Sequence, residues 1–173
     1  MKITGFPQVQ KTLADLGLNV VKFGGRALYR EAEQIMTLSK QYFAPSDRGT
    51  LKASGHVVPP VVQNGKLVVT LAYGGAASGY AVYVHEGTGP AVGRPTFFPP
   101  LEAIKEWAKR HGIPEEAAYP IARAIGERGL SPLKYLEKPL LESARNMDER
   151  LAASVRLDVE KIAKRQANRG ASR

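Results

Sequence analysis

Gly65-Lys66-Leu67-Val68-Val69-Thr70-Leu71 is the stretch of sequence around which the fold is predicted. Its valines and threonine favour a strand, because β-branched side chains pack well on a pleated surface. Two neighbouring segments, Leu51–Val58 and Tyr80–His85, are also predicted strands, the first interrupted by Gly55 and ended by Pro59-Pro60. Short loops join the three segments, so we expect an antiparallel sheet.

Long helices are predicted on both sides of this sheet. Between Asn19 and Phe43, apolar residues recur at spacings of three, four, seven and eight, which places them on one helical face. Pro45 ends this helix, because the residue before a proline avoids the helical region. A second long helix is expected from Pro139 to Ala167, with an apolar stripe narrow enough to be buried against one neighbour. The stripe consists of Met147, Leu151, Val155, Val159 and Ile162.

Shorter helices complete the predicted secondary structure. One is expected over Pro7–Leu16, one after Pro100 with Gly112 at its end, and one over Pro114–Glu127. Thr88–Pro100 is rich in proline and glycine and is predicted to be an extended surface loop. The fold class we predict is α+β, an antiparallel β-sheet flanked by a long N-terminal helix and C-terminal helices.

The composition is that of a globular protein. Apolar residues make up 43% of the 173 residues, which suffices for a sizeable core. We expect a single α+β domain over residues 1–141 and a C-terminal helix with a basic tail over residues 142–173. No apolar run approaches the roughly 20 residues of a membrane span, and the first residues lack the apolar segment of a secretory signal. We therefore expect no membrane partner.

The residue types present restrict the chemistry that the chain can perform. It has no cysteine, which excludes disulfides, thiolate metal ligands and cysteine nucleophiles. The histidines, His56, His85 and His111, match no metal-binding spacing. His85 and Glu86 are adjacent, so on a strand their side chains would point to opposite faces and would not form an acid–base pair. The glycines of residues 74–79 match neither phosphate-binding pattern. We therefore expect no catalytic site, metal site or cofactor, and no enzymatic activity.

Charge is the feature that points to a partner. The formal net charge of +9 favours acidic partners, including nucleic acid. Cations gather near the C-terminus, at Lys161, Lys164, Arg165, Arg169 and Arg173. They form either a surface that contacts phosphates or a solvated helix end whose cations complement the helix dipole, and both interpretations stay open. No aromatic residue lies among them, so stacking on single-stranded nucleic acid is not predicted.

Two motifs in the chain resemble those of the neck, or tail-completion, proteins of tailed phages. Ala44-Pro45-Ser46-Asp47-Arg48-Gly49-Thr50-Leu51-Lys52-Ala53-Ser54 is similar to the family's P-x-D-T-G-x-L-x-x-S stretch, with Arg48 in place of the usual threonine. Tyr80-Ala81-Val82-Tyr83-Val84-His85-Glu86-Gly87 is similar to its Y-A-x-Y-V-H-E-G stretch, and Ile121–Gly129 with Tyr135-Leu136 resembles a later segment. The positions that match the first two motifs are Pro45, Asp47, Gly49, Leu51, Ser54, Tyr80, Ala81, Tyr83, His85, Glu86 and Gly87.

The resemblance implies a virion protein whose copies form a ring between the head connector and the tail, with a lumen for DNA. It implies a hexamer, with a dodecamer as the alternative, assembled in the host cytoplasm beside connector and tail proteins. The proline-rich loop would reach a neighbouring subunit, and the last helix would pack on the subunit body or on a partner. The candidate interface residues are Phe97, Phe98, Trp107, Met147, Leu151, Val155 and Val159, and the candidate contacts to DNA or an acidic partner are Lys161, Lys164, Arg165 and Arg169.

Other functions compete with this interpretation. Within the virion, a tail terminator or a head-closure ring is the closest alternative, because one fold can serve several stacked rings. A cellular DNA-binding protein would account for the charge. A small hydrolase or metal enzyme is supported only by the pair His85-Glu86.

Overall fold

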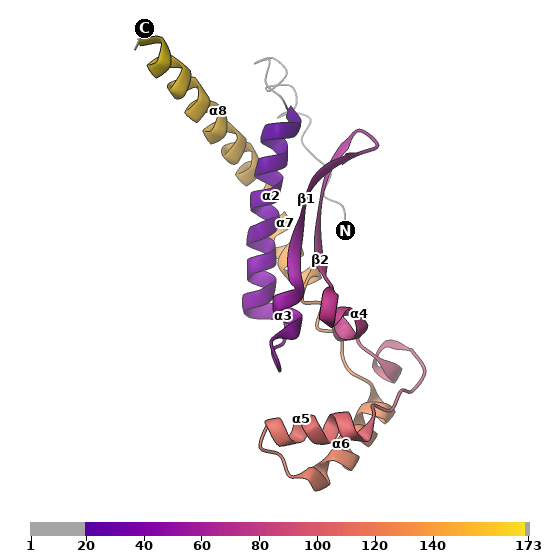
Figure 1. Ribbon diagram of the computed structural model, residues 1–173. Helices are drawn as coiled ribbons and strands as arrows, with labels where there is room; N and C mark the ends of the chain where they lie inside the picture. The colour runs from indigo at the N-terminus through magenta and orange to yellow at the C-terminus, as the bar shows by residue number, and fades with distance from the viewer. Residues whose placement is uncertain (1–19, 172–173) are drawn as a thin grey trace. The chain divides into compact units, whose positions relative to one another are not determined.

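The computed structural model describes residues 20–171 and shows an α+β fold (Figure 1), which confirms the predicted fold class. The chain divides into two compact units. Unit 1 combines the chain up to Gly74 with the chain from Leu136 onward, and unit 2 comprises Gly75–Tyr135. The last helix therefore belongs to the same unit as the long N-terminal helix. The helix predicted over Pro7–Leu16 lies outside the described residues.

The long N-terminal helix is confirmed as α2 (Val20–Leu38), which continues as a π-helical segment over Ser39–Phe43. Ala44 then turns to an extended conformation with ψ of 128°, as a residue before proline prefers. Gly25 lies inside α2, where a glycine weakens a helix. A Cβ atom on Gly25 would lie 3.3 Å from Cγ of Pro60, so the missing side chain lets the neighbouring hairpin approach closely.

That hairpin consists of β1 (Gly55–Gln63) and β2 (Lys66–Tyr73), which pair in antiparallel register. Asn64 and Gly65 join them with φ of 51° and 71°, the positive values that a two-residue hairpin turn requires. Pro59-Pro60 was expected to end the first strand and does not. The register shifts at these two residues, and inside such a bulge a proline need not donate to the ladder.

The strand predicted over Leu51–Val58 begins later than expected. Thr50–Ser54 form the short helix α3 after Gly49, whose φ is 77°, a value that glycine adopts without steric cost. Leu51 is buried, and Oγ of Ser54 donates to the carbonyl of Leu51 at 2.8 Å. The hydroxyl thereby satisfies a carbonyl that the short helix leaves without a partner.

Two helices, and not one, end the described chain. α7 covers Glu137–Ala144 and α8 covers Met147–Ala171, so the prediction of one helix from Pro139 to Ala167 is wrong. In an unbroken helix the carbonyl of Ser143 would accept the amide four residues later. Here it accepts a hydrogen bond from Nη2 of Arg150 at 2.7 Å, which stabilises the break.

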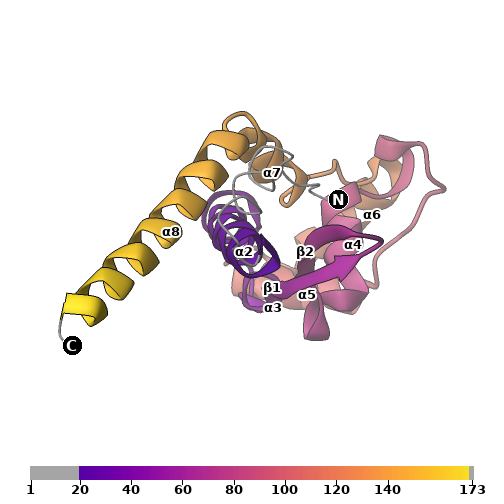
Figure 2. The same ribbon diagram turned by 90° about the horizontal axis from the view of Figure 1, so that it is seen from above.

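The core of unit 1 lies on both sides of α2, which is placed between α8 and the hairpin (Figure 1, Figure 2). The predicted stripe of the last helix is confirmed, because its residues are buried in this core or pack against it. The core consists of Phe23, Ala27, Leu28, Ala32, Ile35, Met36, Val57, Val69, Leu140, Met147, Leu151 and Val155, with Val159 and Ile162 packed against it.

A buried carboxylate joins α2, α7 and α8 of unit 1. Glu31 of α2 is 6% exposed. Its carboxylate accepts hydrogen bonds from Nε and Nη2 of Arg150 on α8, the first at 2.9 Å, and from Oγ of Ser143 on α7 at 2.8 Å. A buried charge is tolerated where it is paired and hydrogen-bonded, so this network fixes how α7 and α8 pack on α2.

Unit 2 is helical. Its helices are α4 (Ser78–Glu86), α5 (Leu101–Arg110) and α6 (Ala118–Arg128), joined with 3₁₀ turns at Gly75–Ala77, Gly89–Val92 and Glu115–Ala117. α5 packs against α6, and both helices match predicted ones. Pro120 lies in the first turn of α6, where its missing amide leaves no helical hydrogen bond unmade. The proline therefore does not divide the helix.

The strand predicted over Tyr80–His85 is wrong, because this segment is α4. A short apolar run is compatible with either a strand or a helix, and its periodicity cannot choose between them. Gly87 ends the helix, with its amide donating to the carbonyl of Tyr83 at 2.8 Å. Within residues 20–171 the sheet therefore has two strands.

Candidate functional site

The second motif lies on α4, and residues 130–135, called here the closing segment, cap the end of this helix. The amide of Leu133 donates to the carbonyl of Val84 at 3.2 Å, and the amide of Lys134 donates to the carbonyl of His85 at 3.1 Å. Carbonyls in the last turn of a helix have no helical partner. The closing segment supplies these partners, with Lys134 in a positive-φ conformation at 51°.

Further contacts hold the two ends of the closing segment. Tyr135 is 3% exposed, and its hydroxyl donates to the carbonyl of Ala81 at 2.9 Å. The ring of Tyr135 meets His85 edge-on, with the ring centroids 4.8 Å apart. At the other end, Thr88 and Leu130 exchange both backbone hydrogen bonds, at 2.9 and 3.1 Å. The motif residues Ala81 and His85 are thus structural contacts of unit 2.

Glu86 binds both its neighbour and the closing segment. Its Oε2 lies 2.8 Å from Nζ of Lys134, and its Oε1 lies 3.5 Å from Nε2 of His85. The expectation that His85 and Glu86 point to opposite faces is therefore wrong, because it assumed a strand. The hydrogen bond from Lys134 lowers the pKa of Glu86 from its usual value. Partial burial opposes this shift, while the charges of Lys134, His85 and Arg94 add to it.

The arrangement suits a structural role better than acid–base catalysis. A carboxylate with a lowered pKa is a weak base, and the carboxylate of Glu86 is already paired with Lys134. Within the part of the chain that the structure describes, no three acidic or histidine side chains lie close enough together to hold a metal ion. The absence of enzymatic activity stays a prediction.

The first motif lies in unit 1 and the second in unit 2. Pro45 and Asp47 are exposed in the loop between the π-helical segment and α3, whereas Leu51 is a buried residue of α3. Gly49 and Ser54 set the two ends of α3 through their backbone angle and hydroxyl. The first motif therefore shapes the loop and short helix before β1, and the second forms α4 and its C-terminal cap.

Three candidate interface residues lie in unit 2. Phe97 and Phe98 are 63% and 56% exposed. Trp107 is half-buried and stacks on His111, with ring centroids 4.5 Å apart. The ring of Phe98 lies over Gly126, where a Cβ atom would clash with it. Phe97 is therefore the more available of the two phenylalanines.

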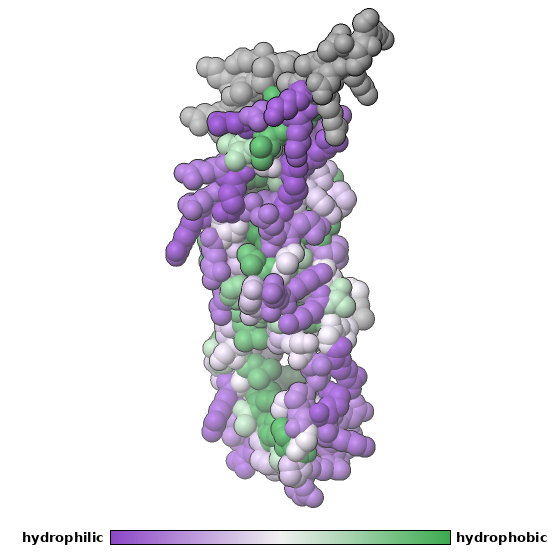
Figure 3. All heavy atoms as spheres, turned by 90° about the vertical axis from the view of Figure 1, so that its left-hand side faces the viewer, coloured by the Kyte–Doolittle hydropathy of each residue, from purple (hydrophilic) through white to green (hydrophobic). Residues whose placement is uncertain are grey.

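The other four candidate interface residues pack on the subunit's own body, which was one of the two alternatives. These residues are Met147, Leu151, Val155 and Val159. Further apolar residues of unit 2 are exposed but were not predicted as interface residues. Tyr80, Val82 and Tyr83 lie on α4, which was predicted to be a strand, and the others are Leu101, Tyr119, Leu130 and Leu133. Figure 3 shows apolar side chains reaching the surface in the part formed by α5 and α6.

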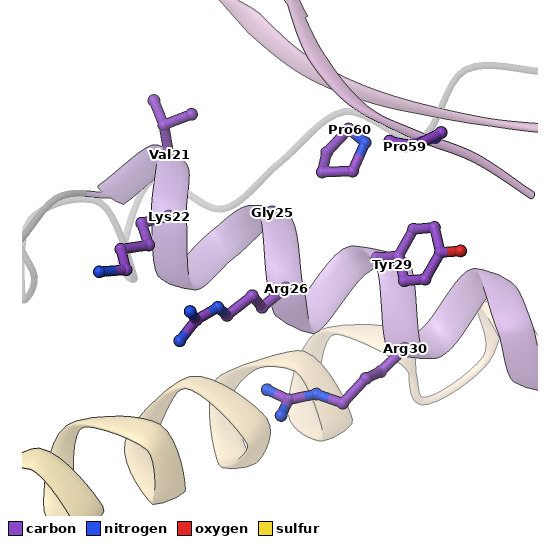
Figure 4. Close-up of a pocket in the computed structure, with 8 residues that line it drawn as sticks. All are labelled: Val21, Lys22, Gly25, Arg26, Tyr29, Arg30, Pro59 and Pro60. Atoms are coloured by element: carbon purple, nitrogen blue, oxygen red, sulfur yellow. The ribbon is translucent and has the colours of Figure 1, made fainter.

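A groove of about 430 Å³ opens in unit 1 between the first half of α2 and β1 (Figure 4). Its hairpin side is apolar, with Tyr29 of α2 and Pro59-Pro60 of β1. Lys22, Arg26 and Arg30 line it as well, and their side chains extend on the side of α2 where α8 lies. The groove therefore borders a row of cations that sequence reasoning did not single out, because four-residue spacing of basic residues is ordinary on a solvated helix.

Of the candidate basic contacts, Lys161 and Lys164 are exposed on α8. Arg165 and Arg169 also belong to α8, but their side chains lie outside what the structure describes, as does all of Arg173. Asp158, one turn before Lys161, forms an ion pair with Arg30 of α2, with 2.7 Å between Oδ2 and Nη2. This ion pair therefore links the positively charged C-terminal part of α8 to the cations of α2.

None of the helices within residues 20–171 is sufficiently long and apolar to span a membrane. Comparisons of the chain with protein-family models, with curated proteins and with solved structures find no match.

Proposed function

We propose that the chain is a structural subunit of the neck of a tailed phage, forming a ring that joins the head connector to the tail and leaves a channel for DNA. The proposal is supported by the likeness of residues 44–54 and 80–87 to motifs of tail-completion proteins. The protein then acts by binding and not by catalysis, and it is assembled in the host cytoplasm. Its partners are copies of itself, as a hexamer or dodecamer, and the adjacent connector and tail proteins.

The observation that carries the proposal is that unit 2 exposes several large aromatic side chains. Tyr83, Phe97 and Tyr119 are 55%, 63% and 65% exposed. Aromatic residues are enriched where proteins meet, and several large exposed ones in one small unit indicate a binding surface. A head-to-tail interface whose rotation closes would bury such residues around a ring.

The helical conformation of the second motif fits this proposal. α4 is capped and held by the closing segment, so Tyr80 and Tyr83 stand on a fixed helix. A fixed aromatic side chain loses little conformational entropy when it binds. The inward residues of the motif, Ala81 and His85, then serve to hold the helix that presents the outward ones.

The size of the purified protein tests the proposal. We expect closed rings in negative-stain images and a hexamer or dodecamer mass in sedimentation experiments. We also expect the neighbouring genes to encode a portal and capsid protein on one side and a tail-tube protein on the other. A protein that sediments as a monomer, encoded among genes without phage structural proteins, would contradict the proposal.

A further inference from the structure

Positive charge gathers at one end of unit 1. From Val20 to Arg30, α2 carries three cations and no acidic residue, and from Arg156 to Ala171, α8 carries five cations and two acidic residues. The other described residues of unit 1 carry seven cations and seven acidic residues. The net positive charge of the described part of unit 1 therefore belongs to these two helix ends.

The two charged segments meet at Arg30 of α2 and Asp158 of α8, and beyond this point the C-terminal end of α8 diverges from α2 (Figure 1, Figure 2). Arg30 and Asp158 form the ion pair between them. The hydrogen bond from Arg30 lowers the pKa of Asp158, and the charges of Lys161 and Arg26 act in the same direction, against the effect of burial. Both Arg26 and Lys161 are therefore close enough to stabilise the charged form of this carboxylate. Hydrophilic side chains project from this end of the unit in Figure 3.

The exposed cations are arranged in rows along the two helices. Lys22, Arg26 and Arg30 follow one another at four-residue spacing, which on a helix gives a row about 12 Å long. Lys161 and Lys164 are exposed on the neighbouring helix. One of the two acidic residues in this region, Asp158, is 12% exposed and already paired with Arg30. Positive charge thus dominates what this surface presents.

We propose that this surface, called here the basic end and defined by Lys22, Arg26, Lys161 and Lys164, binds the phosphate backbone of duplex DNA. The inference rests on the proposed function and deepens it, since it names the residues that face DNA in the channel. Phosphate contacts require exposed Lys and Arg and no base recognition. Protein interfaces are instead depleted of lysine and built around apolar cores, which fits unit 2 and not the basic end.

Binding of a fluorescent duplex, measured by anisotropy over a salt series, tests the inference. The variant replaces the four defining residues: Lys22→Gln, Arg26→Gln, Lys161→Gln and Lys164→Gln. Arg30 is kept, because its ion pair with Asp158 joins the two helices. A matched control removes four exposed cations elsewhere: Lys66→Gln, Lys109→Gln, Lys138→Gln and Arg145→Gln. Both variants have the same net charge, and circular dichroism verifies their folding.

We expect the wild-type protein and the control to bind the duplex, and the basic-end variant to bind at least about tenfold more weakly at low salt. Because each phosphate contact adds about 0.9 to the slope of log K against log salt, the slope should fall by roughly three to four. Equal weakening in both variants, unchanged binding in the basic-end variant, or no binding by the wild-type protein would each overturn the inference.

A second arm identifies the anion. Poly-glutamate at equal charge concentration is added to the protein–duplex complex, and we expect it to displace the duplex only weakly. Efficient displacement would show that the basic end prefers an acidic polypeptide, and the DNA inference would fail. Ring images of the same samples separate the two proposals: rings without duplex binding refute only the basic end, and duplex binding by a monomer refutes only the ring.

Discussion

Gly87 fixes the end of the motif helix through two independent constraints. Its φ of 80° and ψ of 175° lie in a region that essentially only glycine occupies. A Cβ atom there would also lie 2.6 Å from the carbonyl oxygen of Leu130 and 2.9 Å from the nitrogen of Pro132. Both atoms belong to the backbone of the closing segment, so the last residue of the second motif is required to be glycine.

Gly87→Ala is expected to lower the free energy of unfolding by about 3 kcal/mol or more, because backbone strain and overpacking each cost about 1–3 kcal/mol. Gly93→Ala is the matched control. Gly93 also has a positive φ, of 69°, but a Cβ atom there would meet nothing within 4 Å, so about 1–2 kcal/mol is expected. Urea unfolding followed by the fluorescence of Trp107, the single tryptophan of the chain, measures both. Equal losses would show that the closing segment exerts no such constraint.

Glu86 should make the stability of unit 2 depend on pH. Because the hydrogen bond from Lys134 lowers the folded-state pKa of Glu86, its contribution is present above the unfolded-state pKa and is lost as pH falls through the folded-state pKa. Glu86→Gln should therefore destabilise unit 2 at neutral pH and have little effect in acid. Urea midpoints from Trp107 fluorescence at several pH values measure this, with the exposed Glu116→Gln as control. A constant difference between wild type and Glu86→Gln at all pH values would contradict the assignment.

At the scale of elements, α8 has one face that is buried against its own unit and another that is exposed. Leu151 is 1% exposed in the core against α2, whereas Leu157 on the same helix is 54% exposed. The narrow stripe makes this helix dependent on a single neighbour. Its attachment therefore rests on a few apolar residues and on the polar network around Glu31.

Leu151→Ala should lower the free energy of unfolding by about 3 kcal/mol, as is typical when a buried leucine leaves a cavity. Leu157→Ala makes the same chemical change at an exposed site of α8. It should change stability by no more than about 0.5 kcal/mol, since leucine and alanine have similar helix propensities. Thermal unfolding followed by circular dichroism compares the two. Similar losses would mean that α8 does not pack on α2 through this stripe.

Arg150→Met should destabilise unit 1 by about 2 kcal/mol, because it leaves the carboxylate of Glu31 buried without its cation. The value is below that for a fully buried pair, since the side chain of Arg150 is 39% exposed. Arg145→Met, at an exposed position beside the same break between α7 and α8, should change little. The double variant, Glu31→Gln with Arg150→Met, should lose less free energy of unfolding than the sum of the losses of the two single variants. Additive losses would argue against a direct coupling between these two side chains.

At the scale of the whole molecule, most of the net positive charge of the described residues lies in unit 1, whereas most of their exposed aromatic residues lie in unit 2. Unit 2 carries seven cations and six acidic residues and exposes Tyr83, Phe97 and Tyr119. Unit 1 carries its net positive charge on the ends of α2 and α8. The two proposed contacts, with neighbouring protein and with DNA, are therefore assigned to separate units and can be altered one at a time.

Phe97→Ala should weaken assembly by tenfold or more, about 1.4 kcal/mol, if the aromatic surface of unit 2 forms the interface between subunits. Thr96→Ala, at the exposed position just before it, is the control. Phe98 is left unchanged in this comparison, because its ring packs over Gly126 within unit 2. Sedimentation at several concentrations measures the assembly. Unaltered rings with Phe97→Ala would remove this loop from the interface.

The elements that could be predicted from the sequence are those with a long local pattern. The apolar periodicity of α2 and the stripe of α8 extend over several turns, and the β-branched run of β2 follows the turn Asn64-Gly65. In these segments the local preference and the tertiary packing agree. The composition also indicated the net positive charge, although not that α2 adds to it beside α8.

Tertiary contacts decided the segments whose local preference is nearly balanced. α4 is a helix because Gly87 ends it and the closing segment caps it from more than forty residues away. The break between α7 and α8 is stabilised by Arg150, which bonds to Ser143 and to Glu31 of α2. By itself the sequence determined the long helix, the hairpin's second strand and the absence of cysteine chemistry. The tertiary structure alone decided that His85 and Glu86 lie together on a capped helix, because contacts between distant residues outweigh the weak preference of a short apolar run.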